Sequence, residues 1–180
     1  MRRRDFISLV GSAVVVRPFA ARAQQSALPV VGFLSGRSPA ESATVVAAFR
    51  NGLSETGYAE PQNVTIDFRW AEGRPDRLPE LARELVHRPV DVIAAMGESG
   101  PAAKAATITV PVVFGSGGDP VQTGLVASLN RPGGNVTGAT FLTAALGAKR
   151  LGLLRELVPG AEVVALLANP DNCRREVARR

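Results

Sequence analysis

From residue 29 onward, short apolar runs alternate with longer segments in which apolar residues recur at helical spacing. This alternation constrains the fold strongly, because a strand, a helix and a second parallel strand form a right-handed βαβ unit. The pairs Val30-Val31, Val92-Ile93 and Val112-Val113 give near-continuous apolar runs, as strands buried on both faces require. We therefore expect an α/β fold with a doubly wound, mostly parallel sheet of the flavodoxin or Rossmann type.

The pattern also places the individual elements. The first predicted helix begins with Ser38 as N-cap and Pro39 at its first position, and it ends at Gly57. Alternating apolar residues in the second predicted strand indicate an outer, half-buried strand, with Trp70 packed at its end rather than acting as a stacking platform. The predicted strands are 29–35, 63–71, 90–97, 110–116, 135–141 and 162–168, and the predicted helices are 39–57, 76–87, 100–107, 120–129 and 144–157.

Residues 1–23 are predicted to be a signal peptide. They begin with a cluster of arginines, continue with a modestly apolar middle and end in Ala21-Arg22-Ala23, so cleavage is expected after Ala23. The segment Arg3 to Ile7 is similar to the twin-arginine export motif. A membrane anchor is the alternative, but Arg17 and Pro18 interrupt an apolar stretch that is shorter than the roughly 20 residues of a span. We expect a mature protein exported to the periplasm.

The composition excludes several classes of function. Removing residues 1–23, which carry a net charge of +4, lowers the formal net charge of the chain from +5 to +1. No basic stripe remains on the body, so we expect no nucleic-acid partner. Cys173 is the only cysteine and His87 the only histidine, which argues against a disulfide, a multi-histidine metal site and a Ser-His-Asp triad.

Ligands of such sheets bind beyond the carboxyl ends of the strands. This rule selects short loops in which small residues leave backbone N–H groups and hydroxyls facing a cleft. The candidate ligand-binding residues are Ser35, Gly36, Glu98, Ser99, Ser116, Gly117, Asp119 and Thr140.

Two of these candidates are charged, and each has a second interpretation. Asp119 precedes Pro120 and can act as the N-cap of the following helix, a role that is compatible with shaping a cleft. Glu98 either meets a ligand ammonium or is a solvated loop residue. Neither has a second carboxylate close by in sequence that would suggest an acid–base pair. We therefore predict no catalytic residue.

The segment 115-GSGGDP-120 has the glycine content of a phosphate-binding loop. However, the chain contains no GxxxxGK[ST] motif, and Pro120 breaks the GxGxxG pattern. Asp119 at this position would also repel a phosphate. We expect no cofactor, although an exported flavodoxin-like enzyme that binds a flavin or a nucleotide is kept as an alternative.

Several stretches resemble the exported substrate-binding proteins of ABC importers, and in particular a group whose relatives bind tryptophan and other aromatic amino acids. The stretches that carry the likeness are 2-RRRDFISL-9, 30-VVGFLSGRSP-39, 65-TIDFRWAEGRPDRLPELARELV-86, 119-DPVQTGLVASLNRPGGNVTG-138 and 147-GAKRLGLLRELVP-159. The likeness extends to about Pro170, and the chain departs from the family pattern at Cys173.

The resemblance implies a type 1 periplasmic binding protein, in which two doubly wound lobes close on a ligand. Residues 24–159 would form the first lobe, and residues 160–180 the start of a second lobe that is largely missing, followed by an irregular tail. The implied function is capture of a small organic solute, such as an amino acid, for an ABC permease and ATPase. Of the candidates above, Ser35, Glu98, Ser99, Ser116, Gly117 and Asp119 would line the first-lobe side of the cleft. A sugar-binding transcription regulator shares this fold, but the export signal argues against it.

Overall fold

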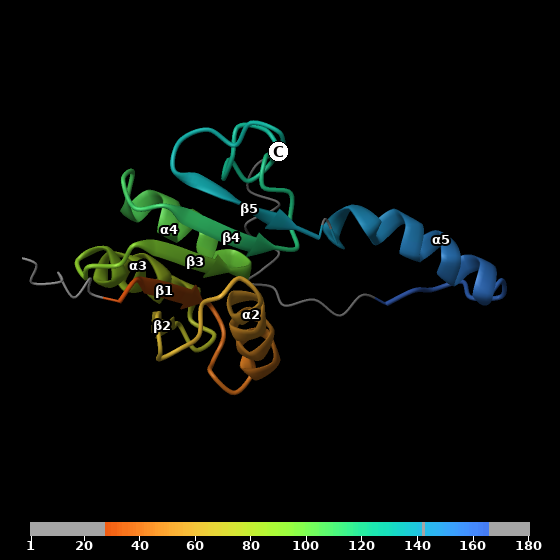
Figure 1. The fold of residues 1–180 in the computed structure, drawn as a ribbon. Coiled ribbons are helices and arrows are strands. Elements are labelled where there is room, and N and C mark those ends of the chain that lie inside the picture. The colour runs from red at the N-terminus through yellow and green to blue at the C-terminus, as the bar shows by residue number, and fades with distance from the viewer. Residues whose placement is uncertain (1–27, 142, 166–180) are drawn as a thin grey trace, which may run out of the picture.

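Five parallel strands form a single sheet in the computed structural model, which describes residues 28–141 and 143–165. The strands are β1 (Val30–Ser35), β2 (Thr65–Trp70), β3 (Val92–Met96), β4 (Val112–Ser116) and β5 (Val136–Thr140), in the order β2-β1-β3-β4-β5 (Figure 1). This is the flavodoxin-like order of a doubly wound sheet. The predicted α/β class is therefore confirmed, as are the first five predicted strands. The signal peptide and Cys173 lie outside the described residues.

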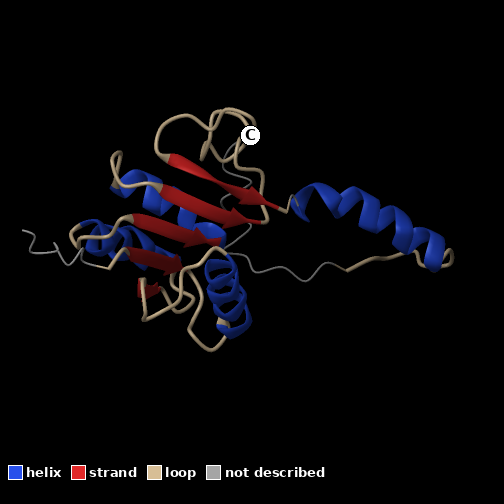
Figure 2. Ribbon diagram, viewed as in Figure 1, coloured by secondary structure: helices blue, strands red, loops and turns tan. Residues whose placement is uncertain are grey.

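Helices cover both faces of the sheet (Figure 2). Helix α2 (Ala43–Glu55) lies on one face, and helices α3 (Leu78–Val86) and α4 (Gly100–Ala106) lie on the other. Short 3-10 helices precede α3 and α4, namely η1 (Pro75–Arg77) and η2 (Gly97–Ser99), and a third, η3 (Thr143–Leu146), follows β5. Parallel strands need such crossover connections, which bury the central strands from both sides.

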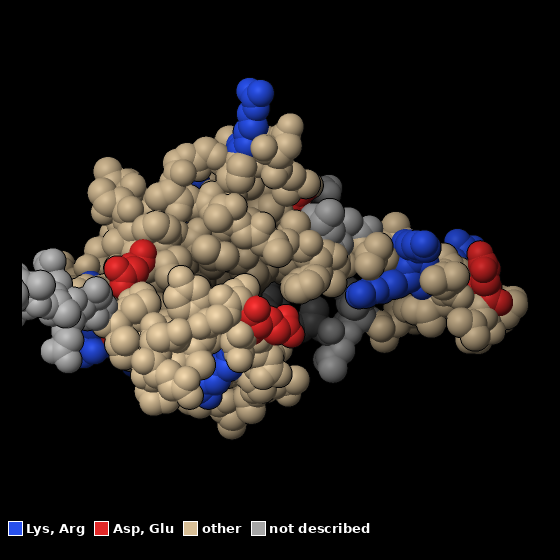
Figure 3. Space-filling model, viewed as in Figure 1, with Lys and Arg blue, Asp and Glu red and all other residues tan. Residues whose placement is uncertain are grey.

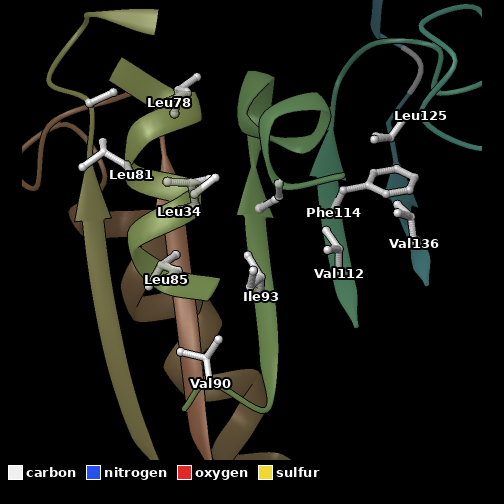
Figure 4. Packing of buried hydrophobic residues seen from close by; sticks show 14 of the residues in the cluster. Leu34, Leu78, Leu81, Leu85, Val90, Ile93, Val112, Phe114, Leu125 and Val136 are labelled. Atoms are coloured by element: carbon white, nitrogen blue, oxygen red, sulfur yellow. The ribbon is translucent and has the colours of Figure 1, made fainter. Parts of the chain in front are cut away.

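The larger core lies between the sheet and helices α3 and α4 (Figure 4). Leu78, Leu81 and Leu85 recur at helical spacing along α3 and are buried against the sheet. The side chain of Leu85 lies over Gly32 of β1, where an added Cβ would come within 3.1 Å of a Leu85 methyl carbon. The absence of a side chain at Gly32 thus lets α3 pack closely on the central strand.

The smaller core is aromatic and lies beneath α2. The ring of Phe33 on β1 is in contact with Phe49 of α2 and with Phe68 and Trp70 of β2, at centroid distances of 5.3 to 5.5 Å. Phe68 and Trp70 stack on each other at 5.6 Å. Since β2 is one of the two edge strands of the sheet, the predicted position of Trp70 at the end of an outer strand is confirmed.

The outer edge of β2 is partly occupied by a side chain. Oε1 of Glu60 accepts a hydrogen bond from the backbone N–H of Ile66 at 3.4 Å, and its other oxygen pairs with Arg50 of α2 at 2.8 Å. Arg50 in turn lies over the ring of Phe68, 5.3 Å from the centroid. Glu60 and Arg50 therefore connect the free edge of the sheet to the helix that covers it.

Two sequence predictions fail in the described residues. Residues 120–129 form no regular helix but a single hydrogen-bonded turn, because Gly124 adopts a left-handed backbone (φ 69°) that stops helix propagation. Residues 161–165 form no strand, although 162–168 is predicted as one. These five residues pair with no neighbouring strand, which a strand requires. The rest of that predicted strand lies outside the described residues.

The predicted helix 144–157 is present as η3 and helix α5 (Gly147–Leu157), but it does not cover the sheet. It projects away from the sheet as a separate arm (Figure 1). Its apolar residues Leu151, Leu154 and Leu157 are exposed. The packed body of the structure thus ends at β5.

Replacing Leu85 with alanine is expected to lower the free energy of unfolding by about 2–5 kcal/mol, because the side chain is fully buried and the site cannot collapse onto Gly32. Urea unfolding of the wild-type and variant chains measures this loss. Leu153→Ala on the exposed arm is the control, with an expected change within about 0.5 kcal/mol. Equal effects of the two substitutions would contradict the core assignment.

Candidate functional site

The carboxyl ends of all five strands lie on one edge of the sheet, because the strands are parallel. From β1 the chain passes to β2 on one side and then crosses to β3 on the other. The helices that follow β1 and β3 therefore lie on opposite faces, and their loops part between these two strands. This topological switch point is where ligands of open α/β sheets bind.

Every candidate residue named from the sequence lies at this edge. Ser35 and Gly36 are at the end of β1, Glu98 and Ser99 follow β3 within η2, and Ser116 ends β4. Gly117 and Asp119 continue the loop after β4, and Thr140 is the last residue of β5. The structure thus brings together positions that are up to 105 residues apart in the chain (residues 35 and 140).

Glu98 and Gly36 meet across the switch point. A Cβ built on Gly36 would lie 2.5 Å from Oε1 of Glu98 and 3.2 Å from its Cγ. Gly36 is buried, whereas the Glu98 residue is exposed. The Glu98 side chain therefore reaches from the end of β3 over the end of β1, and the absence of a side chain at position 36 provides the room. Within residues 28–141 and 143–165, Glu98 has no hydrogen bond or ion pair.

The hydroxyl of Ser99 is used inside the protein. Ser99 is fully buried, and its Oγ lies 2.9 Å from the carbonyl oxygen of Leu34 and 2.8 Å from that of Met96. The hydroxyl thus ties the loop after β3 to strand β1. This arrangement leaves the backbone of Ser99, rather than its side chain, as the part that can face a ligand.

The glycine loop after β4 is held from two directions. Oγ of Ser116 accepts a hydrogen bond from Gly118 N at 3.1 Å, and Oγ1 of Thr140 donates to the Gly118 carbonyl at 2.6 Å. Oγ1 of Thr143 donates to the Gly117 carbonyl at 3.0 Å. Thr143 was not among the candidate residues, although it lies in the loop that follows β5.

Asp119 caps a turn and not the helix that the sequence predicts. Its Oδ1 accepts hydrogen bonds from Val121 N at 2.8 Å and Gln122 N at 3.2 Å, as an N-cap carboxylate does. The turn ends at Gly124, so the capping interpretation holds for one turn only. Lys104 of α4 donates to the carbonyl oxygens of Gly124 and Leu125, which ties this turn to the helix after β3.

The loop after β1 is ordered by side-chain bonds of its own. Oγ of Ser35 accepts a hydrogen bond from Arg37 N at 3.2 Å. Ser38 donates to Oε2 of Glu41 through both its backbone N–H and its hydroxyl, at 3.0 and 2.9 Å. These bonds, the backbone one foremost, lower the pKa of Glu41, with a smaller contribution from the charge of Arg37. Ser38 thus caps the turn that precedes α2 and not the helix itself, which begins at Ala43.

One neighbour of the site was missed from the sequence. The backbone N–H of Gly73, in the loop after β2, donates to the carbonyl of Gly36 at 2.8 Å. The strand-end rule would have found this loop, since β2 ends at the same edge as β1. The loop carries Glu72, which forms an ion pair with Arg77 of η1 at 3.9 Å.

Two hollows of the surface lie beside helix α2. A groove of about 580 Å³ runs between α2 and the ring face of Phe68 and Trp70, and a smaller one of about 210 Å³ lies beside Tyr58 and Glu60.

The described residues hold no group of three or more histidine, cysteine, aspartate or glutamate side chains placed to bind a metal. Over residues 28–141 and 143–165, no helix combines the length and the apolar character needed to cross a membrane. On the face drawn in Figure 3, charged side chains are scattered over the sheet body and gather mainly on α5.

Residues 28–179 match the protein family described as ABC transporter substrate binding protein. A curated relative, the tyrosine-binding protein of Clostridioides difficile, is 32% identical over 131 residues, which is 72% of this chain and 37% of the relative. The chain therefore spans little more than a third of the length of that relative.

Solved structures agree with the family match. The ABC domain from Streptococcus pneumonia in complex with L-Trp is similar at 29% identity and a TM-score of 0.58, covering 63% of this chain and 39% of that one. A conserved domain protein from Vibrio cholerae is similar at 32% identity and a TM-score of 0.65, covering 74% and 44%. The open, ligand-free structure of an adhesive substrate-binding protein from Clostridium difficile, 19% identical with a TM-score of 0.59 over 84% of this chain and 61% of that one, agrees in fold.

Ser99→Ala is expected to lower the free energy of unfolding by about 1–3 kcal/mol, because it leaves the buried carbonyl of Leu34 without its side-chain donor. Urea unfolding measures the change. Ser116→Ala, which removes a less buried hydroxyl that accepts one N–H bond, is the comparison and should cost less. A neutral Ser99→Ala variant would show that the hydroxyl is not structural.

Asp119→Ala is expected to cost about 0.5–2 kcal/mol of stability, since the N–H groups of Val121 and Gln122 lose their acceptor. Asp119→Asn keeps a side-chain oxygen and should retain most of that stability. Chemical denaturation of both variants decides the matter, and equal losses in the two would mean that the charge, not the capping bond, is responsible.

Proposed function

The chain belongs to the ABC transporter substrate-binding protein family, and from this premise we propose that it captures a small organic solute, an amino acid or a related compound, for an ABC importer. The observation that carries the proposal is the carboxyl edge of the sheet. Four strand ends in a doubly wound sheet bring small and polar residues to the switch point, where ligands of this architecture bind. Amino acids are favoured because one similar protein is named as tyrosine-binding and another was solved in complex with L-Trp.

In this proposal the edge supplies one wall of an interlobe cleft. Ser35, Gly36, Ser116 and Gly117 present backbone N–H groups and hydroxyls to the polar head of the solute, while Asp119 and Thr140 hold the loops in place. The buried hydroxyl of Ser99 holds the loop after β3 against β1 through its bond to the Leu34 carbonyl. Closure of a second wall would remove the ligand from water and strengthen each of these contacts.

The exposed arm supports a two-lobed arrangement. Helix α5 leaves the sheet body after β5 and presents Leu151, Leu154 and Leu157 to solvent, whereas α3 and α4 bury their apolar faces. The boundary of the first lobe predicted at residue 159 thus includes a helix that makes no part of the packed body. We propose that α5 belongs with the segment that follows it, and that the first lobe is completed at β5.

The proposed partners and location follow from the family. A solute-binding component delivers its ligand to the permease and ATPase subunits of its importer, and the predicted signal peptide at residues 1–23 would place it in the periplasm. The family consists of substrate-binding proteins rather than enzymes, and we propose no catalytic activity for this chain.

The function is tested by titrating the isotope-labelled chain, residues 24–180, with L-tryptophan and L-tyrosine and following amide chemical shifts by NMR. The expected result is a saturable shift of the Gly36, Gly97 and Gly117 amides, with a Kd weaker than about 0.1 mM because one wall buries less of the ligand than a closed pocket does. Amides at the amino edge of the sheet, such as those of Val64 and Val90, serve as internal controls.

Flavin mononucleotide is titrated in parallel. Saturable shifts with the flavin but with no amino acid would favour the flavodoxin-like alternative, whose strand order is the same. Shifts confined to the groove beside α2 would contradict the location of the site.

A further inference from the structure

Resting on the proposed function, we propose that Glu98 determines specificity by selecting solutes that carry a protonated amine, which its carboxylate receives at the switch point. The inference begins from the absence of a protein partner for this side chain among the described residues. Glu98 is exposed at the end of β3, and no other described residue donates a hydrogen bond to it or forms an ion pair with it.

The other carboxylates around the ends of β1, β3 and β4 are engaged. Both backbone and hydroxyl donors of Ser38 bind Glu41, and two backbone N–H groups bind Asp119. Arg37, the cation nearest in sequence to Gly36, acts on Glu41. Glu98 is thus the one carboxylate of these three loops that accepts no bond from a described residue at either oxygen.

The position of the carboxylate is built into the fold. Strand β3 pairs directly with β1, so the loop after β3 lies beside the loop after β1. Gly36 has no side chain that would clash with Glu98. A Cβ at position 36 would lie only 2.5 Å from Oε1 of Glu98. The buried bonds of Ser99 fix the backbone one residue further along. The backbone that carries the Glu98 side chain is therefore fixed beside the switch point, within reach of Gly36.

The chemistry of a single ionised carboxylate indicates what it recognises. It only accepts hydrogen bonds, and its strongest partners are cationic donors such as an ammonium group. No cluster of acidic side chains in the described residues accompanies it, so a metal ion is not its expected partner. It also repels a ligand carboxylate, and an amino acid would turn its ammonium group toward Glu98 and its carboxylate away.

Three indole probes separate these contributions: L-tryptophan, tryptamine, which has the amine alone, and 3-(indol-3-yl)propanoate, which has the carboxylate alone. Each is titrated into residues 24–180 and followed by the amide shifts of Gly36 and Gly97. The wild-type chain is expected to bind tryptamine at least about tenfold more tightly than the propanoate, the factor that one charge-assisted hydrogen bond provides.

Two variants remove the carboxylate from its place in different ways. Glu98→Gln keeps the shape and removes the charge. Gly36→Ala keeps the charge, but its Cβ displaces the flexible end of Glu98. Both are expected to weaken tryptamine binding by about five- to tenfold and to leave propanoate binding unchanged or stronger. Glu55→Gln at the end of α2, an exposed carboxylate at the opposite edge of the sheet, should bind all three probes as the wild type does.

The outcomes distinguish the two proposals. If L-tryptophan binds at this edge and Glu98→Gln binds tryptamine within twofold of the wild type, the role of Glu98 is overturned while the proposed function stands. Tighter binding of the propanoate than of tryptamine by the wild-type chain would likewise overturn the role of Glu98 alone. If none of the three indoles nor L-tyrosine shifts these amides, both proposals are overturned. Unchanged dispersion of the amide spectrum in each variant verifies that the chain is folded.

Discussion

The parallel direction of all five strands is the constraint on which the rest of the structure depends. Parallel strands need crossover connections, and the helices in these connections cover both faces of the sheet at β1 and β3, whereas parts of β4 and β5 stay exposed. The same constraint gathers every strand's carboxyl end on one edge. Residues from loops far apart in the chain thus meet there without any of them needing to be close in sequence.

Much of this arrangement was readable from the sequence, because apolar period and turn residues are local signals. These signals predict the five strands and the four α-helices of the described residues, and they also predict that Trp70 lies on an outer strand. The helix predicted at 120–129 is absent because Gly124 has a left-handed backbone. Glycine can adopt both helical and left-handed conformations, so its presence in the sequence does not show which one occurs. The contacts of the site were not readable, since the Ser99 hydroxyl bonds Leu34 across 65 residues and the approach of Glu98 to Gly36 depends on strand order.

The polar residues of the edge divide into two kinds. Ser99, Ser116, Thr140 and Asp119 use their side chains mainly to hold loop backbones, and these bonds make the edge rigid. Glu98 differs, because its carboxylate faces outward while its backbone is fixed by its neighbours. A rigid support with one outward charge is the arrangement expected where orientation of a ligand matters more than the number of contacts.

The projecting helix α5 has a consequence for how order in this chain is distributed. Eleven residues are fewer than an isolated helix needs to be stable in water, and α5 buries no residue against the sheet. Its helical state therefore depends on whatever surface comes to rest on Leu151, Leu154 and Leu157, whereas α3 and α4 carry their own support. The helix content of α5 should therefore rise when a surface packs on these leucines, without a change in the stability of the sheet body.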